Sequence, residues 1–209
     1  KEFRPWLELE ALAQRCQLRH EVRRAAHEGM KRAPDTNALL ALFELLRNDP
    51  KARPLLEQAV AMRPADPAFR ARLAHVYAHS GQWFAAARLF EQASLLGGNY
   101  GFEAADQYRM AGQYRDALRL NGMVASSDAQ QAQRIAIVFE QKRYARIVAM
   151  KPNLPDLGSR YRVAYAHYAV GDYRDAKARA QALLHTSYRE EAAALLKAMG
   201  SDRTEASSQ

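Results

Sequence analysis

Two stretches of the chain share one pattern: residues 71–86 read ARLAHVYAHSGQWFAA, and residues 161–176 read YRVAYAHYAVGDYRDA. Each has a glycine, an aromatic residue two positions later and an alanine three positions after that. A third stretch, FEAADQYRMAGQYRDA at 102–117, follows the same spacing. Recurrence of one pattern along a chain predicts an array of similar structural units.

The composition favours helices throughout the chain. Ala, Leu, Arg, Glu and Gln dominate, and all are strong helix formers, whereas β-branched residues are few. Apolar residues recur at intervals of three and four, as at Ala86, Leu89, Phe90 and Ala93, and no alternating strand pattern persists. We therefore expect an all-α protein.

Turn residues interrupt the helical pattern often. The breaks are NDP at 48–50, RPADP at 63–67, GGN at 97–99, SSD at 126–128 and KPNLPDLG at 151–158. Asp66 before Pro67 predicts a helix start, because an Asp side chain accepts the first free N–H groups and Pro is tolerated at the first helical position. Between the breaks there is room for two short helices and a turn.

The repeated residues resemble the tetratricopeptide repeat (TPR) family, whose unit of about 34 residues is a helix–turn–helix. The unit at 67–100 matches through Leu73, Ala74, Tyr77, Gly81, Trp83, Ala86, Phe90 and Ala93. The unit at 98–131 matches through Ala105, Tyr108, Gly112, Tyr114 and Ala117, with Asn121 where the family usually has Phe. The unit at 157–190 matches through Val163, Ala164, Gly171, Tyr173 and Ala176.

The resemblance implies a right-handed α-solenoid of five to six TPR-like repeats in a single domain at 1–200. Three further units, at 3–36, 33–66 and 128–156, keep only a few of the family residues: Trp6, Leu9 and Pro34 in the first, Leu39, Ala52, Ala59 and Pro64 in the second, and Phe139 and Tyr144 in the third. Residues 187–200 are expected to form a C-terminal capping helix, and 201–209 a disordered tail.

The repeat residues have clear packing roles. Small residues such as Ala74 and Ala86 let two helices approach closely, and aromatic residues fill the space between neighbouring pairs. Gly81, Gly112 and Gly171 follow a helix end, where a positive φ costs little only for glycine. Stacked neighbours complete a core that no single pair can bury alone.

The sequence contains no recognisable catalytic motif. Phosphate-binding, dinucleotide-binding, zinc-protease, nucleophile-elbow and CxxC signatures are all missing, so we expect a non-enzyme without cofactors. His75 and His79 lie four residues apart and could share a metal ion, but no third ligand is evident, so no metal is expected. Cys16 is the single cysteine and is interpreted as a small buried hydrophobe.

The resemblance also indicates where a partner would bind, because the first helix of each repeat lines a groove. Transferred to this chain, the groove residues are His75, His79, Phe102, Asp106, Arg109, Tyr161, Tyr165 and Tyr168. Ala71 and Ala78 would flank the histidines. The Lys and Asn residues with which some family members hold a C-terminal carboxylate are missing. An aromatic groove instead suits an apolar or Tyr/Arg-rich segment.

Two alternatives remain open from the sequence. Tyr161, Tyr165 and Tyr168 are spaced four and three, which also describes a buried helix stripe. The formal charge of +8 and the eight basic and three acidic residues at 109–151 fit nucleic-acid binding, although Tyr114 and Tyr144 are repeat-core positions. We expect instead a scaffold that binds another protein.

The composition resembles that of a GC-rich Gram-negative bacterium, and no stretch is apolar enough to span a membrane. The chain begins without Met, as a segment of a longer protein would. Its organisation is similar to the soluble TPR domain of the membrane-anchored component of a bacterial Pel-type exopolysaccharide secretion system. That similarity implies a protein partner in a membrane-associated complex, on the cytoplasmic side of the inner membrane or, alternatively, in the periplasm.

Overall fold

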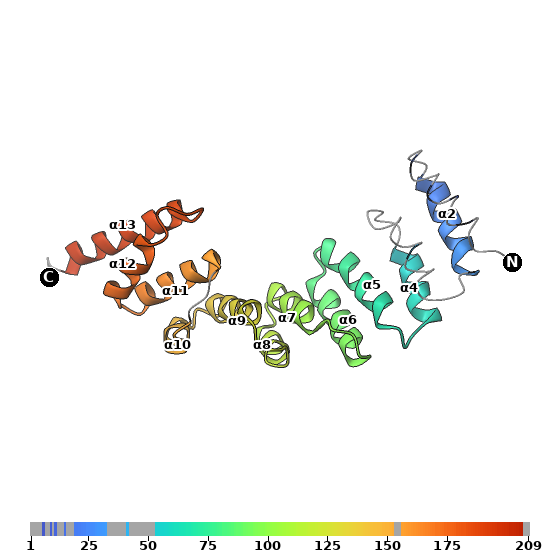
Figure 1. The fold of residues 1–209 in the computed structure, drawn as a ribbon, viewed down its shortest axis with the longest axis horizontal. Helices are drawn as coiled ribbons and strands as arrows, with labels where there is room; N and C mark the ends of the chain where they lie inside the picture. The colour runs from blue at the N-terminus through green and yellow to red at the C-terminus, as the bar shows by residue number, and fades with distance from the viewer. Residues whose placement is uncertain are drawn as a thin grey trace. The chain divides into compact units, whose positions relative to one another are not determined.

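The computed structural model describes residues 19–32, 53–152 and 156–206 and five isolated positions: Trp6, Leu9, Ala11, Arg15 and Ala41. Within these residues the chain forms eleven helices and no strand (Figure 1). The all-α prediction is therefore confirmed. Cys16, Pro34, Leu39 and Ala52 lie outside the described residues, as does the tail beyond Ala206.

The chain divides into two compact units, Lys1–Ala111 and Gly112–Gln209. The first contains α2 (Arg19–Met30), α4 (Arg53–Met62), α5 (Pro67–His79), α6 (Trp83–Leu95) and α7 (Gly101–Met110). The second contains α8 (Tyr114–Asn121), α9 (Asp128–Glu140), α10 (Tyr144–Met150), α11 (Leu157–Ala169), α12 (Tyr173–Gln181) and α13 (Arg189–Ala206). The boundary separates the two helices of the predicted unit at 98–131. None of the described helices has both the length and the hydropathy that crossing a membrane requires.

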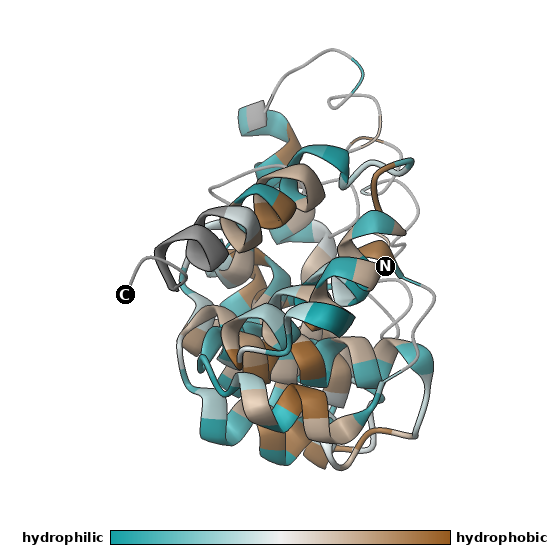
Figure 2. Ribbon diagram, turned by 90° about the vertical axis from the view of Figure 1, so that its left-hand side faces the viewer, coloured by the Kyte–Doolittle hydropathy of each residue, from teal (hydrophilic) through white to brown (hydrophobic). Residues whose placement is uncertain are grey.

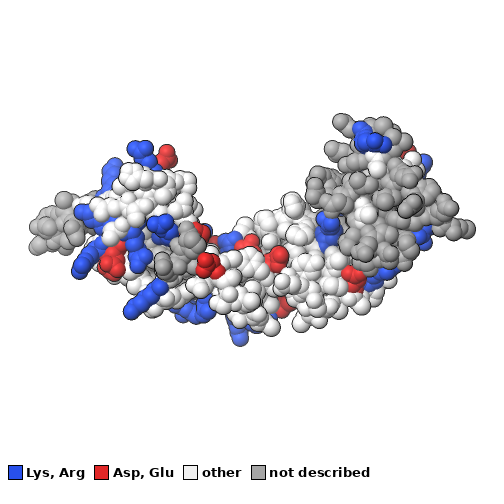
Figure 3. All heavy atoms as spheres, in the orientation of Figure 1, with Lys and Arg blue, Asp and Glu red and all other residues white. Residues whose placement is uncertain are grey.

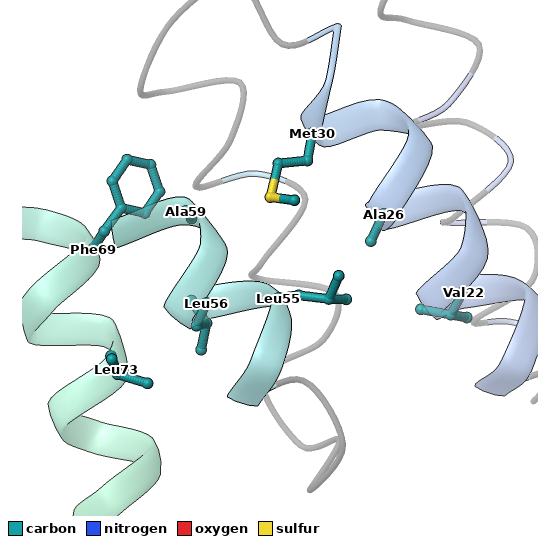
Figure 4. Packing of buried hydrophobic residues seen from close by; sticks show 8 residues of the cluster. All are labelled: Val22, Ala26, Met30, Leu55, Leu56, Ala59, Phe69 and Leu73. Atoms are coloured by element: carbon teal, nitrogen blue, oxygen red, sulfur yellow. The ribbon is translucent and has the colours of Figure 1, made fainter. Parts of the chain in front are cut away.

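The first unit is held together by helices that pack in sequence, α4 on α5, α5 on α6 and α6 on α7. Its core cluster joins three helices (Figure 4): Val22, Ala26 and Met30 from α2, Leu55, Leu56 and Ala59 from α4, and Phe69 and Leu73 from α5. Burying each large apolar side chain contributes about 1.5–3 kcal/mol. The partly degenerate unit at 33–66 thus still supplies a packed second helix through Ala59.

The second unit repeats the same arrangement. Helices α9 and α10 pack together, as do α11 and α12, and α11 also contacts α9 of the preceding pair. Hydrophobic and hydrophilic segments alternate along the helices that face the viewer in Figure 2, as expected of amphipathic helices. Two core clusters fill the space between the pairs: one of Ile135, Val138, Ile147, Val163 and Ala166, and one of Ala164, Ala176, Ala180, Leu195 and Met199. Paired helices stacked on paired helices are the α-solenoid architecture.

The turns inside the helical pairs follow the prediction. Gly81, Gly112 and Gly171 have φ values of 73°, 72° and 84°. The corresponding turn between α9 and α10 has Lys142 in their place, with φ 56°. A side chain with a Cβ is strained in this region, so the fourth turn forms at a cost that the glycine turns avoid.

The helix ends agree with the sequence at α5 and differ at α13. Asp66 caps α5 by accepting a hydrogen bond from the Ala68 N–H at 2.9 Å, and Pro67 is the first helical residue, as predicted. Helix α13 begins at Arg189, two residues after the expected start of the capping helix at 187, and continues past Gly200 to Ala206, into the segment predicted to be disordered. A single internal glycine costs a helix only about 1 kcal/mol, and no proline follows it.

Candidate functional site

Three tyrosines line one side of α11. Tyr161, Tyr165 and Tyr168 are spaced four and three residues apart, so they lie on successive turns. The ring centroids of Tyr161 and Tyr165 are 6.5 Å apart, and those of Tyr165 and Tyr168 are 5.9 Å apart. All three side chains are partly exposed. The structure therefore brings together the three predicted groove residues of this unit.

Rings from neighbouring elements extend this row. Tyr165 contacts Phe139 of α9 and Tyr144 of α10, with ring centroids 5.5 and 5.6 Å away, both edge to face. Tyr161 stacks on Tyr188 at 5.6 Å, and Tyr168 meets Tyr173 of α12 at 5.9 Å. We call these seven residues the aromatic surface: Phe139, Tyr144, Tyr161, Tyr165, Tyr168, Tyr173 and Tyr188. Each is partly exposed.

The aromatic surface is both core and surface, which explains why spacing alone left the two interpretations open. Tyr161, Tyr165, Tyr168 and Tyr173 pack against the core cluster that includes Ala164 and Ala176, yet each keeps part of its ring accessible. Such rings are held in place from behind. They therefore present contact area without the entropy loss of ordering a free side chain.

Two hydroxyl groups at this surface, those of Tyr144 and Tyr161, have a raised pKa and stay protonated at neutral pH. Desolvation raises the pKa of Tyr161 above its usual value, and the nearby Glu191 carboxylate and Tyr165 raise it further. Desolvation, with a smaller contribution from Tyr165, also raises the pKa of Tyr144. A neutral tyrosine hydroxyl both donates and accepts a hydrogen bond. The surface thus combines apolar ring edges with polar tips.

Sequence reasoning missed four of the seven rings as site residues. Tyr144 and Tyr173 occupy the aromatic position after the turn, which was interpreted as repeat core. Phe139 belongs to a unit with otherwise small groove residues, and Tyr188 lies at the start of the expected capping helix. The sequence feature that could have revealed these rings is the large number of aromatic residues between 139 and 188. Helical periodicity does not take this number into account.

In the first unit, two predicted groove residues pair with each other. The Arg109 guanidinium donates through Nε and Nη2 to Asp106 Oδ1, at 3.0 and 2.9 Å. The pair lies on α7, where Phe102 and Met110 are 37% and 45% exposed. Because the two charges neutralise each other, this part of the predicted groove is less charged than the sequence suggests.

The two histidines of α5 also have local partners. His79 Nδ1 lies 2.7 Å from the His75 carbonyl oxygen, and the His75 ring meets Phe90 edge on at 4.9 Å. His75 is exposed overall, but desolvation by its neighbours lowers its pKa, and the positive charge of Arg72 lowers it further. The family resemblance implied that Ala71 lies in the groove beside these histidines. Ala71 is instead buried at 3% exposure, so it faces the core and not a partner.

One cluster in the described residues has the composition of a metal site. His167, Asp172 and Asp175 offer ligand atoms within 4.8 Å of one another. His167 Nδ1 lies 2.8 Å from Asp172 Oδ2, however, and Asp172 also caps α12 by accepting from the Asp175 N–H. These bonds give the cluster a structural role at the turn between α11 and α12.

Comparison with known proteins adds one finding. A family model described as tetratricopeptide repeat matches residues 50–105, which contain α4, α5 and α6. No curated protein and no solved structure gave a significant match to the chain. The matched segment includes the unit at 67–100, whose turn glycine and helix cap have the predicted geometry. The match and this geometry together support the assignment of residues 50–105 to the tetratricopeptide repeat family.

Proposed function

We propose that this chain is a non-enzymatic scaffold that binds another protein through the aromatic surface of its second unit. Tetratricopeptide repeats generally mediate protein–protein interactions and are typically not enzymes. The observation that supports this site is the set of seven contacting, partly exposed rings on four helices and the segment before α13.

The chemistry of the surface suits a protein partner. Tyrosine is enriched where interfaces derive most of their binding energy, since its large rigid ring is apolar and its hydroxyl satisfies a polar group. The rings of Phe139, Tyr144 and Tyr165 contact one another edge to face, so their faces are already partly occupied. This arrangement suits an apolar or Tyr/Arg-rich segment better than a stack of nucleic-acid bases.

The cellular setting that we propose is the assembly of a bacterial envelope complex. The similarity in organisation to the TPR domain of Pel-type exopolysaccharide secretion supports an exopolysaccharide role at the inner membrane, within a biofilm-forming system. The excess of Lys and Arg over Asp and Glu supports the cytoplasmic side, where anionic lipids attract basic segments, with the periplasm as the alternative.

The test is affinity capture with the full chain, followed by titration of the purified partner. Tyr165→Ala removes the ring that contacts four others in the aromatic surface, and we expect the Kd to rise at least about tenfold, as at interface hot spots. Tyr114→Ala is the matched control, because Tyr114 is a partly exposed tyrosine of the same unit outside the aromatic surface. Arg109→Ala tests the predicted groove of the first unit in the same assay.

Two outcomes would contradict the proposal. If Tyr165→Ala binds the partner as tightly as the unchanged chain does, the aromatic surface is not the binding site. If the chain instead binds oligonucleotides with an affinity that falls steeply as the salt concentration rises, the chain is a nucleic-acid-binding protein.

A further inference from the structure

A second surface lies between α12 and α13. A groove of about 260 Å³ is lined there by Tyr173, Lys177 and Gln181 of α12 and by Leu196, Met199 and Gly200 of α13. We call it the terminal groove. Its volume is much larger than the roughly 30 Å³ that one water occupies, so it accommodates a side chain. Tyr173 is the residue that it shares with the aromatic surface.

The floor of the terminal groove is apolar and continuous with the core. Met199 is 5% exposed and Leu196 is partly buried, and both belong to the cluster around Ala176 and Ala180. An apolar side chain placed in the groove would therefore rest on packed side chains and lose its own contact with water. Burial of one such side chain contributes about 1.5–3 kcal/mol.

The rim of the terminal groove is polar and positive on the α12 side. Lys177 and Gln181 are exposed and one helical turn apart, so both point along the same side of α12. Arg174, also exposed, lies one turn before Lys177. Among the described residues neither cation forms an ion pair. Lys and Arg side chains are prominent over α11–α13 on the face shown in Figure 3.

Four acidic residues of α13 lie before and after the groove along the helix axis: Glu190 and Glu191 precede it, and Asp202 and Glu205 follow it. Glu190 and Glu191 are in the first turn of α13, whereas the groove uses Leu196 to Gly200, about 8–15 Å farther along the axis. Asp175 is on the turn bonded to Asp172. Lys177 itself lines the groove and forms no ion pair among the described residues.

We propose that the terminal groove binds an amphipathic helix of a partner protein that carries acidic residues. One apolar side chain of that helix rests on Leu196 and Met199, and a carboxylate one turn away pairs with Lys177. A helix is the fitting occupant because the groove runs between two packed helices, where the side chains of a third helix interlock. The unpaired positive charge of Lys177 favours a carboxylate over an ammonium group at this point of the rim.

The test uses two labelled model peptides and the full chain. Both are alanine-based helices with leucines on one side, and they differ only in flanking glutamates or lysines. Fluorescence anisotropy measures the Kd, and NMR follows the Met199 methyl group. We expect the glutamate peptide to bind and to shift the Met199 signal, and the lysine peptide to bind at least about tenfold more weakly.

Substitutions on α12 locate the contact. Lys177→Glu should raise the Kd of the glutamate peptide at least about tenfold, and Gln181→Lys should lower it. Arg179→Glu is the matched control, because it makes the same charge change at an exposed position of α12 outside the groove lining, and it should leave the Kd nearly unchanged. Lys177 and Gln181 are exposed, so these changes leave the core intact.

Three results would overturn this proposal: equal binding of both peptides, binding unaffected by Lys177→Glu, or no change at Met199. A dimer in sedimentation that Lys177→Glu abolishes would assign the groove to a second copy of the chain and would also overturn it. Tyr165→Ala should leave peptide binding intact, so failure of the aromatic-surface proposal is distinguishable from failure of this one.

Discussion

Tyr108 of α7 donates a hydrogen bond from its hydroxyl to Glu91 Oε2 of α6 at 2.7 Å, which ties one repeat to the one before it. The same bond occurs one repeat earlier, where the Tyr77 hydroxyl donates to Glu57 Oε1 of α4 at 3.2 Å. Tyr77 and Tyr108 hold equivalent positions in the units at 67–100 and 98–131, and each glutamate lies in the second helix of the preceding unit. The tyrosine at this position of the family pattern thus forms a hydrogen bond from one repeat to the repeat before it.

The unit at 157–190 breaks this rule. His167 stands where Tyr77 and Tyr108 stand, is buried at 6% exposure, and bonds to Asp172 within its own repeat. The equivalent of the two glutamates in the preceding unit is Pro152, which has no side-chain acceptor. His167 therefore joins α11 to α12 in place of a link to the repeat before it.

Tyr108→Phe should destabilise the protein by about 1–2 kcal/mol. The change keeps the buried ring but removes the donor to the Glu91 carboxylate, and hydrogen bonds to charged groups contribute more than neutral ones. Tyr77→Phe should cost less, because the Tyr77 bond is longer and more exposed. Urea unfolding of both variants measures the difference, and equal effects would show that the bond geometry does not decide its strength.

Asp172→Asn should change how stability depends on pH. The hydrogen bond from His167 lowers the pKa of Asp172, and the backbone N–H of Asp175 lowers it further. A depressed pKa stabilises the folded state above the unfolded pKa of an aspartate, about 3.9, and that stabilisation is lost as pH falls through the folded value.

The unchanged chain should therefore be more stable than Asp172→Asn at neutral pH. This gap, the difference in free energy of unfolding between the two chains, should narrow as the pH falls below about 4. Thermal unfolding across this range checks the sign. Asp175→Asn, in the same turn but outside the His167 bond, is the control and should not narrow the gap in this way. A gap that widens in acid would refute the assigned role of the carboxylate.

Substitutions in two equivalent turns should act in opposite directions. Gly171→Ala places a Cβ at φ 84°, where it meets no other atom, so the cost of about 1 kcal/mol is purely backbone strain. Lys142→Gly relieves the same strain at φ 56° and should raise the unfolding free energy by about 0.5–1 kcal/mol. Chemical denaturation checks both, and a destabilised Lys142→Gly would mean that the lysine side chain contributes more than its backbone costs.

Asn121→Leu should destabilise the second unit by about 1–3 kcal/mol, because it leaves buried amides without partners. Asn121 donates to the Gln130 carbonyl oxygen and to Gln133 Oε1, and Gln130 Nε2 donates back to Asn121. All three residues are less than 10% exposed.

Replacing Asn121, Gln130 and Gln133 together with leucine should recover part of this loss, since no side-chain amide then stays unpaired. Gln131→Leu, at an exposed position of α9, is the control and should have little effect. A single Asn121→Leu variant as stable as the unchanged chain would show that water replaces the network.

Much of the fold was predictable because it depends on short-range rules. Asp66 and Pro67 begin α5, and Gly81, Gly112 and Gly171 adopt positive φ, since each of these features depends on residues within one helical turn. Asn121, where the family has Phe, showed only that the core changes there. The bonded amide network could not be predicted, because its partners come from another helix.

The sequence by itself determined that the chain is helical, where its turns fall and which residues keep the repeat spacing, because these are local properties of the backbone. Only the tertiary structure decided that Tyr108 bonds to Glu91, that Asn121 bonds to Gln130 and Gln133, and that rings from α9 and α10 meet Tyr165 of α11. Residues with the same helical spacing can be buried or exposed. Which of the two they are is decided only when neighbouring helices cover one side of the helix that carries them.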